Sequence, residues 1–508
     1  MSDDDQPDTP DFAEGVAAAD VPLDGVLLGH VGEGRVILAR VDGDIVAVSA
    51  DCTHYRGPLE EGLRMGETIR CPWHHACFSL RTGAALEAPA LSPLARWEVE
   101  LDGDRVRVGR EASPAAPARS RATDPETIVI VGGGAAGFAA AQRLRDLGYG
   151  GTLTLISDDA CAPYDRPNLS KDYLSGEAEA DWLPLKPDAF YAENRIDLRL
   201  GVRATALDTG ARRLTLEGGE SLTYDRLLMA TGARPNSLDL PGLEASSVHL
   251  LRSRADAEAL IAAANGARTA AIIGASFIGL EVAGALRKRG LEVHVIAPDA
   301  IPFASKLGPE LGSFIRRLHE KEGVVFHLGR KAKGYENGRV TLDDGATVSA
   351  DLVVAGVGVA PCLELAEAAG LATDEGVVVD ARFRTSAPGV FAAGDIARYP
   401  DCVSGQPIRV EHWVAAERQG QVAAANMLGL ATPFQEPPFF WTAFYGLGLH
   451  YVGHAETWDS IEIEGDLESQ AAVLLYIKNG APQAVVTVGP EQATLDAAQA
   501  FRERCRGG

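Results

Sequence analysis

Four side chains of metal-binding type stand in two short loops near the start of the chain. The first loop contains Cys52 and His54, and the second contains Cys71 and His74, in the pattern C-x-H-x16-C-x2-H. Thiolate and imidazole groups together form ligand sets for zinc and for iron–sulfur clusters. The spacing therefore predicts a metal centre built from one Cys and one His of each loop.

The distribution of these ligands favours a cluster over a zinc ion. Zinc fingers usually pair Cys with Cys and His with His, whereas here each loop offers one of each. In a Rieske [2Fe–2S] centre the cysteines hold one iron and the histidines hold the other, so each loop bridges the cluster. Residues 20–110, with the motifs CTH, CPWH and FSLRTG, resemble Rieske ferredoxins and the Rieske domains of oxygenases. Zinc stays open as the alternative.

The same resemblance bears on the residues beside the second ligand pair. His75 and Cys77 are expected to be neighbours rather than ligands. High-potential respiratory Rieske proteins carry Ser and Tyr where this chain has Ala76 and Phe78. Hydrogen bonds from those hydroxyls stabilise the reduced cluster, so their loss predicts a potential near the low end of the Rieske range, about −150 mV.

The segment TIVIVGGGAAGFAAAQRLRDLG is typical of a dinucleotide-binding unit. An apolar strand is followed by Gly132, Gly134 and Gly137 in a G-x-G-x-x-G pattern that includes Ala135. These glycines permit a tight turn and a close approach to a pyrophosphate, which the N-terminus of the next helix faces. After the following strand comes Asp158, which is placed to hydrogen-bond a ribose.

A second copy of this pattern begins with TAAIIGASFIG. Gly274, Ser276 and Gly279 occupy the three glycine positions, and the serine departs from the consensus. The usual position of the ribose-binding acid is an alanine, and Asp299 follows two residues later. No cluster of arginines follows that would bind a 2′-phosphate, and Lys306 is the nearest cation. We therefore expect NADH rather than NADPH at this site.

Two strand–turn segments indicate a flavin at the first site. The segment LLMATGARP places Thr231 and Gly232 at the end of a strand, and VFAAGDIA places Gly394 and Asp395 at the end of another. An Asp at such a turn can bind a ribitol hydroxyl while the following helix faces the flavin phosphate. With the glycine motifs, residues 127–430 resemble the pyridine-nucleotide-dependent flavoprotein reductases, which implies FAD in the first site and NAD in an inserted unit.

Three longer motifs resemble the oxygenase-coupled NADH–ferredoxin reductases and the apoptosis-inducing-factor-like proteins. They are PYDRPNLSK, VEHWVAAERQGQVAAANMLG and PPFFWTAFYG. This resemblance implies that Lys171 lines the flavin, that Glu281 lies near the nicotinamide, and that the two can pair as the catalytic residues. The other residues that it places around the flavin are Arg166, Glu411, His412, Trp413 and Trp441.

These motifs must be positioned by segments of different character. Short strands with turns, such as DGD at 42–44 and 102–104, indicate a small all-β domain, and strands alternating with Ala-rich helices indicate parallel α/β units. The expected fold is multidomain: an all-β Rieske domain, two interleaved Rossmann-like α/β domains and a C-terminal α+β domain. The expected segments are 1–19 (disordered acidic tail), 20–110 (Rieske domain), 111–126 (linker), 127–248 (FAD domain, first part), 249–375 (NAD(P)H domain), 376–432 (FAD domain, second part) and 433–508 (C-terminal domain).

Composition narrows the location and the partners. The net charge of −24 disfavours nucleic acid and anionic membranes as partners. We find no apolar run long enough to span a membrane and no secretory signal in the acidic start. The cysteines indicate no disulfide framework, and a reducing cytoplasm is expected. The cysteines expected to stand alone as ordinary thiols are Cys161, Cys362, Cys402 and Cys505.

Together, the motifs predict electron transfer from NADH through FAD to a Rieske cluster and on to an acceptor protein such as an oxygenase component or a ferredoxin. A redox-sensing flavoprotein with slow turnover is the alternative. An oxygenase is disfavoured, because outside the cluster loops only His450 and His454 form a close pair, and no domain is left to house a catalytic iron. The oligomeric state stays open, a homodimer included.

Overall fold

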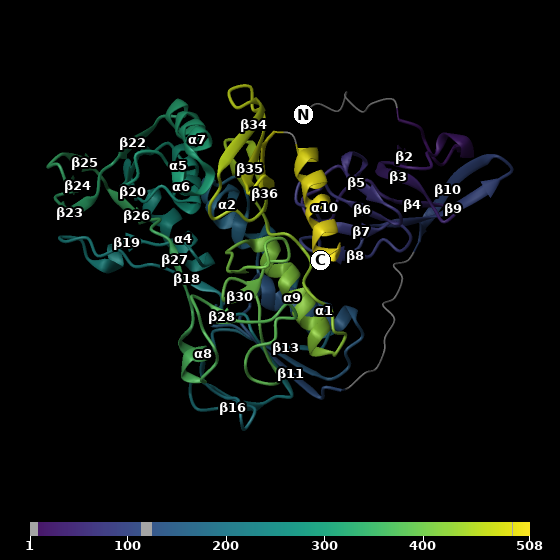
Figure 1. Cartoon of the computed structure of the whole chain (residues 1–508), viewed down its shortest axis with the longest axis horizontal. Helices are drawn as coiled ribbons and strands as arrows, with labels where there is room; N and C mark the ends of the chain where they lie inside the picture. Colours follow the sequence, from purple (N-terminus) through teal and green to yellow (C-terminus); the bar gives the residue numbers. More distant parts are fainter. Residues whose placement is uncertain (1–8, 113–123, 490, 508) are drawn as a thin grey trace.

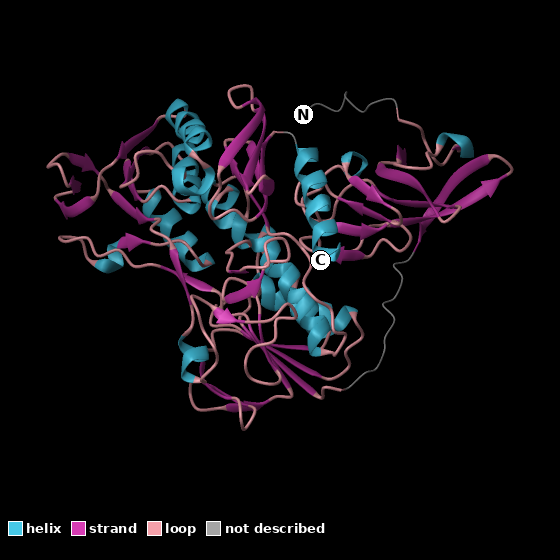
Figure 2. Ribbon diagram, viewed as in Figure 1, coloured by secondary structure: helices cyan, strands magenta, loops and turns pink. Residues whose placement is uncertain are grey.

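The computed structural model describes residues 9–112, 124–489 and 491–507. Figure 1 shows the N-terminal β domain on one side of the C-terminal sheet and helix, a lobe of alternating strands and helices on the other, and a further sheet below them. Figure 2 shows that the N-terminal domain consists mostly of strands, whereas helices gather in the middle of the molecule. The expected multidomain fold is confirmed.

The N-terminal domain combines a six-stranded antiparallel sheet with a four-stranded sheet that carries the cluster loops. Its strands are β1 (Val16–Ala17), β2 (Leu27–Val31), β3 (Gly34–Val41), β4 (Asp44–Ser49), β5 (Leu63–Met65), β6 (Thr68–Arg70), β7 (Cys77–Ser79), β8 (Ala85–Glu87), β9 (Arg96–Asp102) and β10 (Arg105–Ala112). As expected, the DGD turns join β3 to β4 and β9 to β10. One cluster loop leads from β4 to β5, and the other leads from β6 to β7.

The prediction of a disordered tail is wrong for residues 9–19. Phe12 is fully buried, and β1 pairs with β10 at the edge of the larger sheet. A Cβ on Gly29 would lie 2.3 Å from the Phe12 ring, so a glycine in β2 makes room for this aromatic side chain. One buried ring thus anchors an acidic segment whose composition suggested disorder. Residues 1–8 and the main part of the expected linker, 113–123, lie outside the described residues.

The first dinucleotide unit is a five-stranded parallel sheet in the order β13-β12-β11-β17-β29. Its elements are β11 (Thr127–Val131), α1 (Ala135–Asp146), β12 (Thr152–Ile156), β13 (Ile196–Arg199), β17 (Arg226–Met229), β29 (Val390–Ala392) and α9 (Trp413–Met427). Helices α1 and α9 pack closely, because a Cβ on Gly420 would lie only 2.1 Å from the Ala136 carbonyl oxygen. Distant segments of the chain therefore build one sheet and one helix pair.

The second dinucleotide unit is another five-stranded parallel sheet, in the order β19-β26-β20-β21-β22. Its elements are β19 (Val248–His249), α4 (Arg254–Ala264), β20 (Thr269–Ile273), α5 (Phe277–Lys288), β21 (Glu292–Ala297), α6 (Ala304–Leu307), α7 (Pro309–Lys321), β22 (Val324–Leu328) and β26 (Leu352–Ala355). Its apolar core continues into the C-terminal sheet, so these two parts pack as one body.

The chain passes between the two units through an antiparallel strand pair, β18 (Ala233–Pro235) and β27 (Val359–Pro361). Helix α8 (Glu364–Ala368) follows, and Ala366 and Leu371 lie in the core of the first unit. The chain therefore returns to the first unit before residue 376, where the sequence placed the boundary. The smaller elements are β14 (Ala204–Asp208), β15 (Arg213–Leu216), β16 (Ser221–Thr223), β23 (Ala332–Glu336), β24 (Arg339–Leu342), β25 (Thr347–Ser349), β28 (Val377–Val378), β30 (Ala397–Pro400), β31 (Pro407–Ile408), α2 (Asp172–Ser175) and α3 (Asp188–Glu193).

The C-terminal domain is an antiparallel sheet in the order β32-β33-β36-β35-β34, covered by one helix. Its elements are β32 (Phe439–Phe444), β33 (Leu447–Gly453), β34 (Ser460–Asp466), β35 (Ala471–Lys478), β36 (Ala481–Val488) and α10 (Glu491–Gly507). Helix α10 packs on β33 and β36 and also touches β5 of the N-terminal domain. The expected C-terminal α+β domain is confirmed. No described helix is long and apolar enough to cross a membrane.

The prediction that Cys402 and Cys505 stand alone is wrong, because they form a disulfide. The bond joins α10 to the loop that follows β30 in the first unit. The sequence hid this pair because the two cysteines are 103 residues apart and meet only when the C-terminal helix docks. Cys161 and Cys362 are free thiols, as expected. Cysteine usage is therefore weaker support for a reducing compartment than the sequence suggested.

Candidate functional site

The two cluster loops bring their cysteines together in the interior of the protein. Cys52 and Cys71 are each 1% exposed, and the contact with the Cys71 thiol lowers the pKa of Cys52. Backbone hydrogen bonds close each loop: Cys52 N donates to the Gly57 carbonyl at 2.9 Å, and Cys71 N donates to the Ala76 carbonyl at 2.9 Å. A Cβ on Gly57 would lie 2.7 Å from Cys71 Sγ, so the glycine leaves the space that this sulfur needs.

The two histidines form a second pair next to the cysteines in the chain. The Nδ1 atoms of His54 and His74 lie 3.2 Å apart. Burial lowers the pKa of His54 to about 3 and keeps the pKa of His74 well below its usual range, so both rings are neutral at pH 7, the form that binds metals. Over the described ranges, no three His, Cys, Asp or Glu side chains gather as one ion would require. A thiol pair and an imidazole pair fit the two irons of a Rieske cluster better than one zinc ion.

The neighbours of the second ligand pair have other surroundings. His75 is fully buried, and its ring stacks on Phe439 of β32 with centroids 4.2 Å apart. Cys77 opens β7, and burial raises the pKa of its thiol to about 11. Each of these side chains is accommodated by packing, which is consistent with the expectation that neither is a ligand.

Aromatic rings cover the histidine pair where the N-terminal domain meets the rest of the molecule. Tyr55 stacks on His54 with centroids 3.9 Å apart, and Trp441 of β32 lies 4.5 Å from the ring of His74. The Tyr55 hydroxyl donates a hydrogen bond to Asp165 of the PYDRPNLSK motif. Neither motif predicts this bond, because Tyr55 and Asp165 meet only when the two domains dock.

Trp441 connects the histidine pair with the expected catalytic residues. The Lys171 ammonium lies 5.0 Å from the centre of the Trp441 ring and 2.9 Å from Glu281 Oε2. Glu281 is 6% exposed, and it accepts hydrogen bonds from Ser170 Oγ at 2.5 Å and Thr442 Oγ1 at 2.6 Å. The structure thus brings Lys171, Glu281 and Trp441 together. The two hydroxyls that fix Glu281 come from other elements, so its helix alone could not indicate them.

The first glycine motif has the geometry that a flavin dinucleotide needs. Gly132 has a φ of +116°, and a Cβ on it would lie 2.1 Å from the Ala230 carbonyl oxygen. A Cβ on Gly137 would lie 1.8 Å from the Gly132 carbonyl oxygen, so any larger residue would open the turn. The Arg166 guanidinium lies 3.4 Å from the Cβ position of Gly134, and its buried Nε has no partner within the described chain. An unpaired cation beside a glycine turn at a helix N-terminus suits a pyrophosphate.

The two strand-end turns lie next to this cradle. Gly394 has a φ of +83°, and its N–H donates to Gln419 Oε1 of α9 at 2.8 Å. Asp395 forms an ion pair with Arg252 at 2.9 Å, which the sequence did not indicate. The Arg252 guanidinium also lies 3.2 Å from the Cβ position of Gly232. Thr231 lies beside Gly232, so both expected turns and an additional arginine surround one region.

The second glycine motif keeps its geometry despite the serine. Gly274 has a φ of +106°, and a Cβ on Gly279 would lie 2.4 Å from the Gly274 carbonyl oxygen. Ser276 is the N-cap of α5, and its hydroxyl accepts a hydrogen bond from Gly279 N at 3.1 Å. The departure from the consensus therefore gives α5 a favourable start. Arg330 lies at the end of β21, since its N–H donates to the Ala297 carbonyl at 3.1 Å, and the sequence did not single it out.

Most of the remaining expected residues lie around the first unit. Glu411 pairs with Arg409 at 2.5 Å, and Trp413 is the first residue of α9. The His412 ring stacks on Phe440 with centroids 4.5 Å apart. Burial lowers the pKa of His412 to about 4. Asp158 and Asp299 follow strands β12 and β21 respectively; Asp158 is exposed and pairs with Arg203 at 3.1 Å.

The chain thus combines two dinucleotide units with glycine turns and a domain that carries paired Cys and His side chains. Aromatic side chains lie between this domain and the first unit. These features define a flavin-dependent NAD(P)H oxidoreductase with an iron–sulfur domain. Residues 126–420 match the pyridine nucleotide-disulphide oxidoreductase family, and residues 15–98 match the Rieske [2Fe-2S] domain. The chain belongs to the pyridine nucleotide-disulphide oxidoreductases, in the branch of Rieske-containing, FAD-dependent ferredoxin reductases and apoptosis-inducing-factor-like proteins.

Individual relatives agree with this assignment. Apoptosis-inducing factor 3 from Homo sapiens is 32% identical over 481 residues, covering 90% of this chain and 78% of the relative. The ferredoxin–NAD(+) reductase component of the biphenyl dioxygenase system from Paraburkholderia xenovorans is 36% identical over 368 residues, covering 72% and 90%. Among solved structures, the covalent putidaredoxin reductase–putidaredoxin complex matches with a TM-score of 0.72 and 33% identity, covering 75% of this chain and 93% of that one.

Proposed function

We propose that this chain takes electrons from NADH, passes them through FAD to its own Rieske cluster, and delivers them to an acceptor protein such as an oxygenase component or a ferredoxin. The observation that carries the proposal is the unbroken contact from His74 through Trp441 to the Lys171–Glu281 pair. Bound FAD would supply the conversion between a two-electron hydride donor and a one-electron acceptor.

The cluster would be held by Cys52 and Cys71 on one iron and by His54 and His74 on the other. Cys52, Cys71 and His74 are buried, which fits a low-dielectric site, and the hydroxyl-free residues Ala76 and Phe78 beside them are both fully buried. Fewer hydrogen bonds to the cluster sulfurs keep the potential low, about −150 mV, within reach of an NADH-fed flavin.

The residues of the first unit would bind FAD and orient it. The glycine turn with Ala135 and Arg166 would hold the pyrophosphate, and Asp395 would hold the ribitol once it exchanges its partner Arg252. Lys171 and Glu281 would balance their charges beside the isoalloxazine while Trp441 excludes water from the gap to His74. The other residues proposed for the FAD site are Gly132, Gly134, Gly137, Asp158, Thr231, Gly232, Gly394, Glu411, His412 and Trp413.

The second unit would bind NADH in preference to NADPH. Gly274, Ser276 and Gly279 would face the pyrophosphate at the start of α5. The backbone of Arg330 lies beside the end of β21, and its side chain pairs with Asp344 at 2.6 Å. No cluster of arginines follows β21 in the sequence to bind a 2′-phosphate, which supports the choice of NADH.

The acceptor is proposed from the relatives. The names of several relatives place them in dioxygenase systems as ferredoxin reductase components, and one solved relative is a complex with putidaredoxin. We therefore propose a small iron–sulfur protein or an oxygenase component as the partner.

The proposed location is the cytoplasm. The oligomeric state, a homodimer included, would be measured by sedimentation of the same holoprotein.

Anaerobic reduction by NADH, followed by freeze-quench EPR, tests this function. We expect flavin bleaching and then a Rieske-type signal that appears at the rate of multi-turnover cytochrome c reduction. A flavin that is reduced while the cluster stays oxidised would refute internal transfer. Fast flavin reduction with very slow turnover on every acceptor would instead favour the redox-sensing role.

A further inference from the structure

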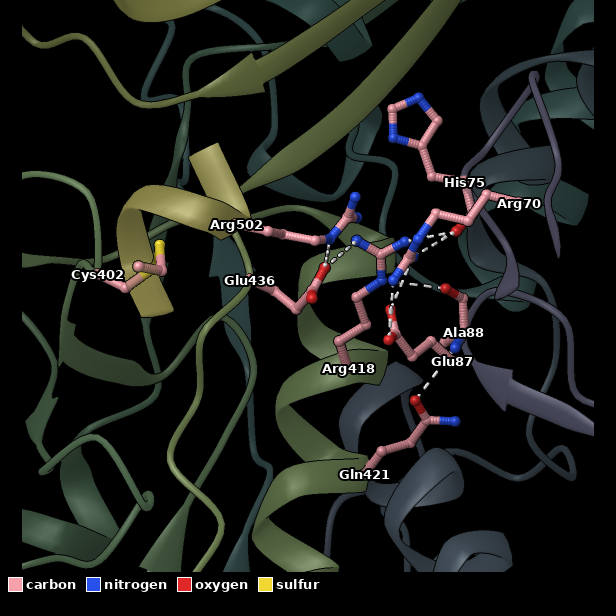
Figure 3. A network of polar contacts seen from close by, with 10 residues as sticks. Arg70, His75, Glu87, Ala88, Cys402, Arg418, Gln421, Glu436 and Arg502 are labelled. Carbon is pink, nitrogen blue, oxygen red and sulfur yellow. Dashed lines mark hydrogen bonds and ion pairs between the residues drawn. A yellow bond between two sulfur atoms is a disulfide. The ribbon is translucent and has the colours of Figure 1, made fainter. Parts of the chain in front are cut away.

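Each cluster loop is held from across the domain boundary at the residue directly after its histidine. Tyr55 follows His54, and its hydroxyl donates to Asp165 in the segment between β12 and α2. His75 follows His74, and its carbonyl accepts a hydrogen bond from Arg418 of α9 at 2.9 Å (Figure 3). Two buried residues of the flavoprotein half therefore hold the two histidine-bearing loops at equivalent positions.

Arg418 is buried between the N-terminal domain and the flavoprotein half. It is 3% exposed, and its Nε also donates to the carbonyl of Ala88 in the N-terminal domain at 3.1 Å. Its third contact is an ion pair with Glu436 at 3.4 Å, and Glu436 is shared with Arg502 of α10 at 2.8 Å (Figure 3). A buried guanidinium whose N–H groups are held by hydrogen bonds and an ion pair fixes the position of carbonyl groups more tightly than an exposed charge could.

Arg418 and its bonds to the carbonyls of His75 and Ala88 are called the clamp below. Helix α9 links this clamp to the flavin site. Trp413, proposed above as part of the FAD site, is the first residue of α9, and Arg418 lies little more than one turn further on. In the same helix, Gly420 packs against Ala136 in the first turn of α1. The helix is thus pressed against the pyrophosphate turn at one place and bonded to the cluster loop at another, so it sets the distance between the two.

We propose that Arg418 and Asp165 are positioning residues that hold the two cluster histidines at a fixed distance from the flavin, so that electrons pass within the chain. This inference rests on the proposed function for the transfer step, but the docking itself does not. Other contacts also join the two halves of the molecule, such as those that Lys186 and Gln142 make with the Leu91 carbonyl at 2.8 and 2.6 Å. These contacts should keep the N-terminal domain attached when Arg418 or Asp165 is replaced. Such a variant should therefore change the position of the cluster loops and not the attachment of the domain.

Arg418→Met tests the clamp, and Arg502→Met is the matched control. Both replace a buried arginine that pairs with Glu436, but only Arg418 bonds carbonyl groups of the N-terminal domain. In Arg418→Met we expect electron transfer from flavin to cluster to slow by at least about tenfold, because small misplacements of reacting groups have large effects on rates. NADH–ferricyanide activity, which reports the flavin half, should stay within about twofold of wild type, as should all rates in Arg502→Met.

Two further readouts separate positioning from damage. Amide exchange of residues 71–77 should accelerate in Arg418→Met and stay at the wild-type rate in Arg502→Met. The EPR spectrum of the chemically reduced cluster should not change in either variant. Arg418→Lys, which keeps the charge and a single donor nitrogen, should recover part of the transfer rate.

The first loop has its own pair of variants. Asp165→Leu removes the acceptor for Tyr55 and should slow transfer, whereas Asp165→Asn keeps a carbonyl acceptor and should remain close to wild type. Wild-type amide exchange in Arg418→Met, or accelerated exchange with an unchanged transfer rate, would overturn the proposal. If NADH fails to reduce the cluster even in the wild-type protein, the proposed function fails, and the exchange measurements still decide whether Arg418 holds the loop.

Discussion

The two dinucleotide units share one local design and differ in how the chain completes them. In each, a strand leads into a glycine with φ above +100° and then into a helix, with Gly132 in the first unit and Gly274 in the second. The second unit is built from one continuous segment, β19 to β26. The first is finished by β29 and α9, which arrive after the chain has left and returned.

This difference matches the different roles of the two dinucleotides. A cofactor enclosed by segments from distant parts of the chain can leave only when those segments separate, which suits FAD as a resident group. A unit built from one contiguous segment needs no distant segment to complete its nucleotide site, which suits a co-substrate that must exchange in every cycle. Two arginines, Arg166 and Arg252, lie at the first site.

Matched glycine substitutions give the largest effect and test this division directly. Gly137→Ala places a Cβ 1.8 Å from a backbone oxygen in the first unit, and Gly279→Ala places one 2.4 Å away in the second. Overpacking of this kind costs about 1–3 kcal/mol. We expect Gly137→Ala to lose bound FAD on purification, and Gly279→Ala to keep FAD but raise the KM for NADH at least about tenfold. Flavin content per chain and steady-state kinetics measure both; equal flavin loss in the two variants would remove the distinction.

The disulfide gives the next largest effect. Cys402 lies in the returning part of the first unit and Cys505 lies in α10, so the bond fastens the segment that completes the flavin site. Removing a bond that closes so long a loop costs about 2–5 kcal/mol. The double variant Cys402→Ala/Cys505→Ala should therefore release flavin at a temperature several degrees lower, measured by flavin fluorescence on heating. Cys161→Ala, which removes a free thiol, is the control and should leave that temperature unchanged.

A smaller effect is expected where the second unit lacks an acid. Ala297, the last residue of β21, occupies the place where a carboxylate usually binds the ribose. Ala297→Glu should improve the kcat/KM ratio of NADH over NADPH by about tenfold, because a carboxylate there accepts from the 2′-hydroxyl and repels a 2′-phosphate. Competition between the two coenzymes measures the ratio. An unchanged ratio would mean that the ribose lies elsewhere, and the flavin content serves as the internal control.

How much of the molecule could be predicted from the sequence depended on whether the signal was local. The glycine turns, the Cys–His loops and the DGD hairpins were predictable because each depends on neighbours in the chain. The Lys171–Glu281 pair was expected only from a family resemblance. Phe12, the disulfide and the clamp of Arg418 were missed for one physical reason. Burial, cross-linking and docking depend on residues tens to hundreds of positions away, and no local pattern encodes which of them will meet.

The smallest expected effect concerns the buried acids of two helices, α5 and α9. Glu281 of α5 is neutralised by Lys171 at 2.9 Å, whereas Glu417 of α9 is 1% exposed and its Oε2 has no partner within the described chain. Burial, followed by the nearby Asp165 carboxylate, raises the pKa of Glu417 well above its ordinary value. The folded protein therefore binds a proton more tightly than the unfolded chain. The resulting stabilisation is complete below the unfolded pKa and disappears as the pH rises through the folded pKa.

Glu417→Gln should therefore leave stability nearly unchanged at about pH 5 and increase it at about pH 8, where wild type must bury a charge or hold a proton. A gain of about 1 kcal/mol would raise the melting temperature by about 2–4 °C. Glu503→Gln, at an exposed position of α10, is the control and should show no such dependence. The melting temperatures of the holoproteins across this range measure the difference. A gain that is equal at both pH values would show that packing, and not the charge of Glu417, distinguishes α9 from α5.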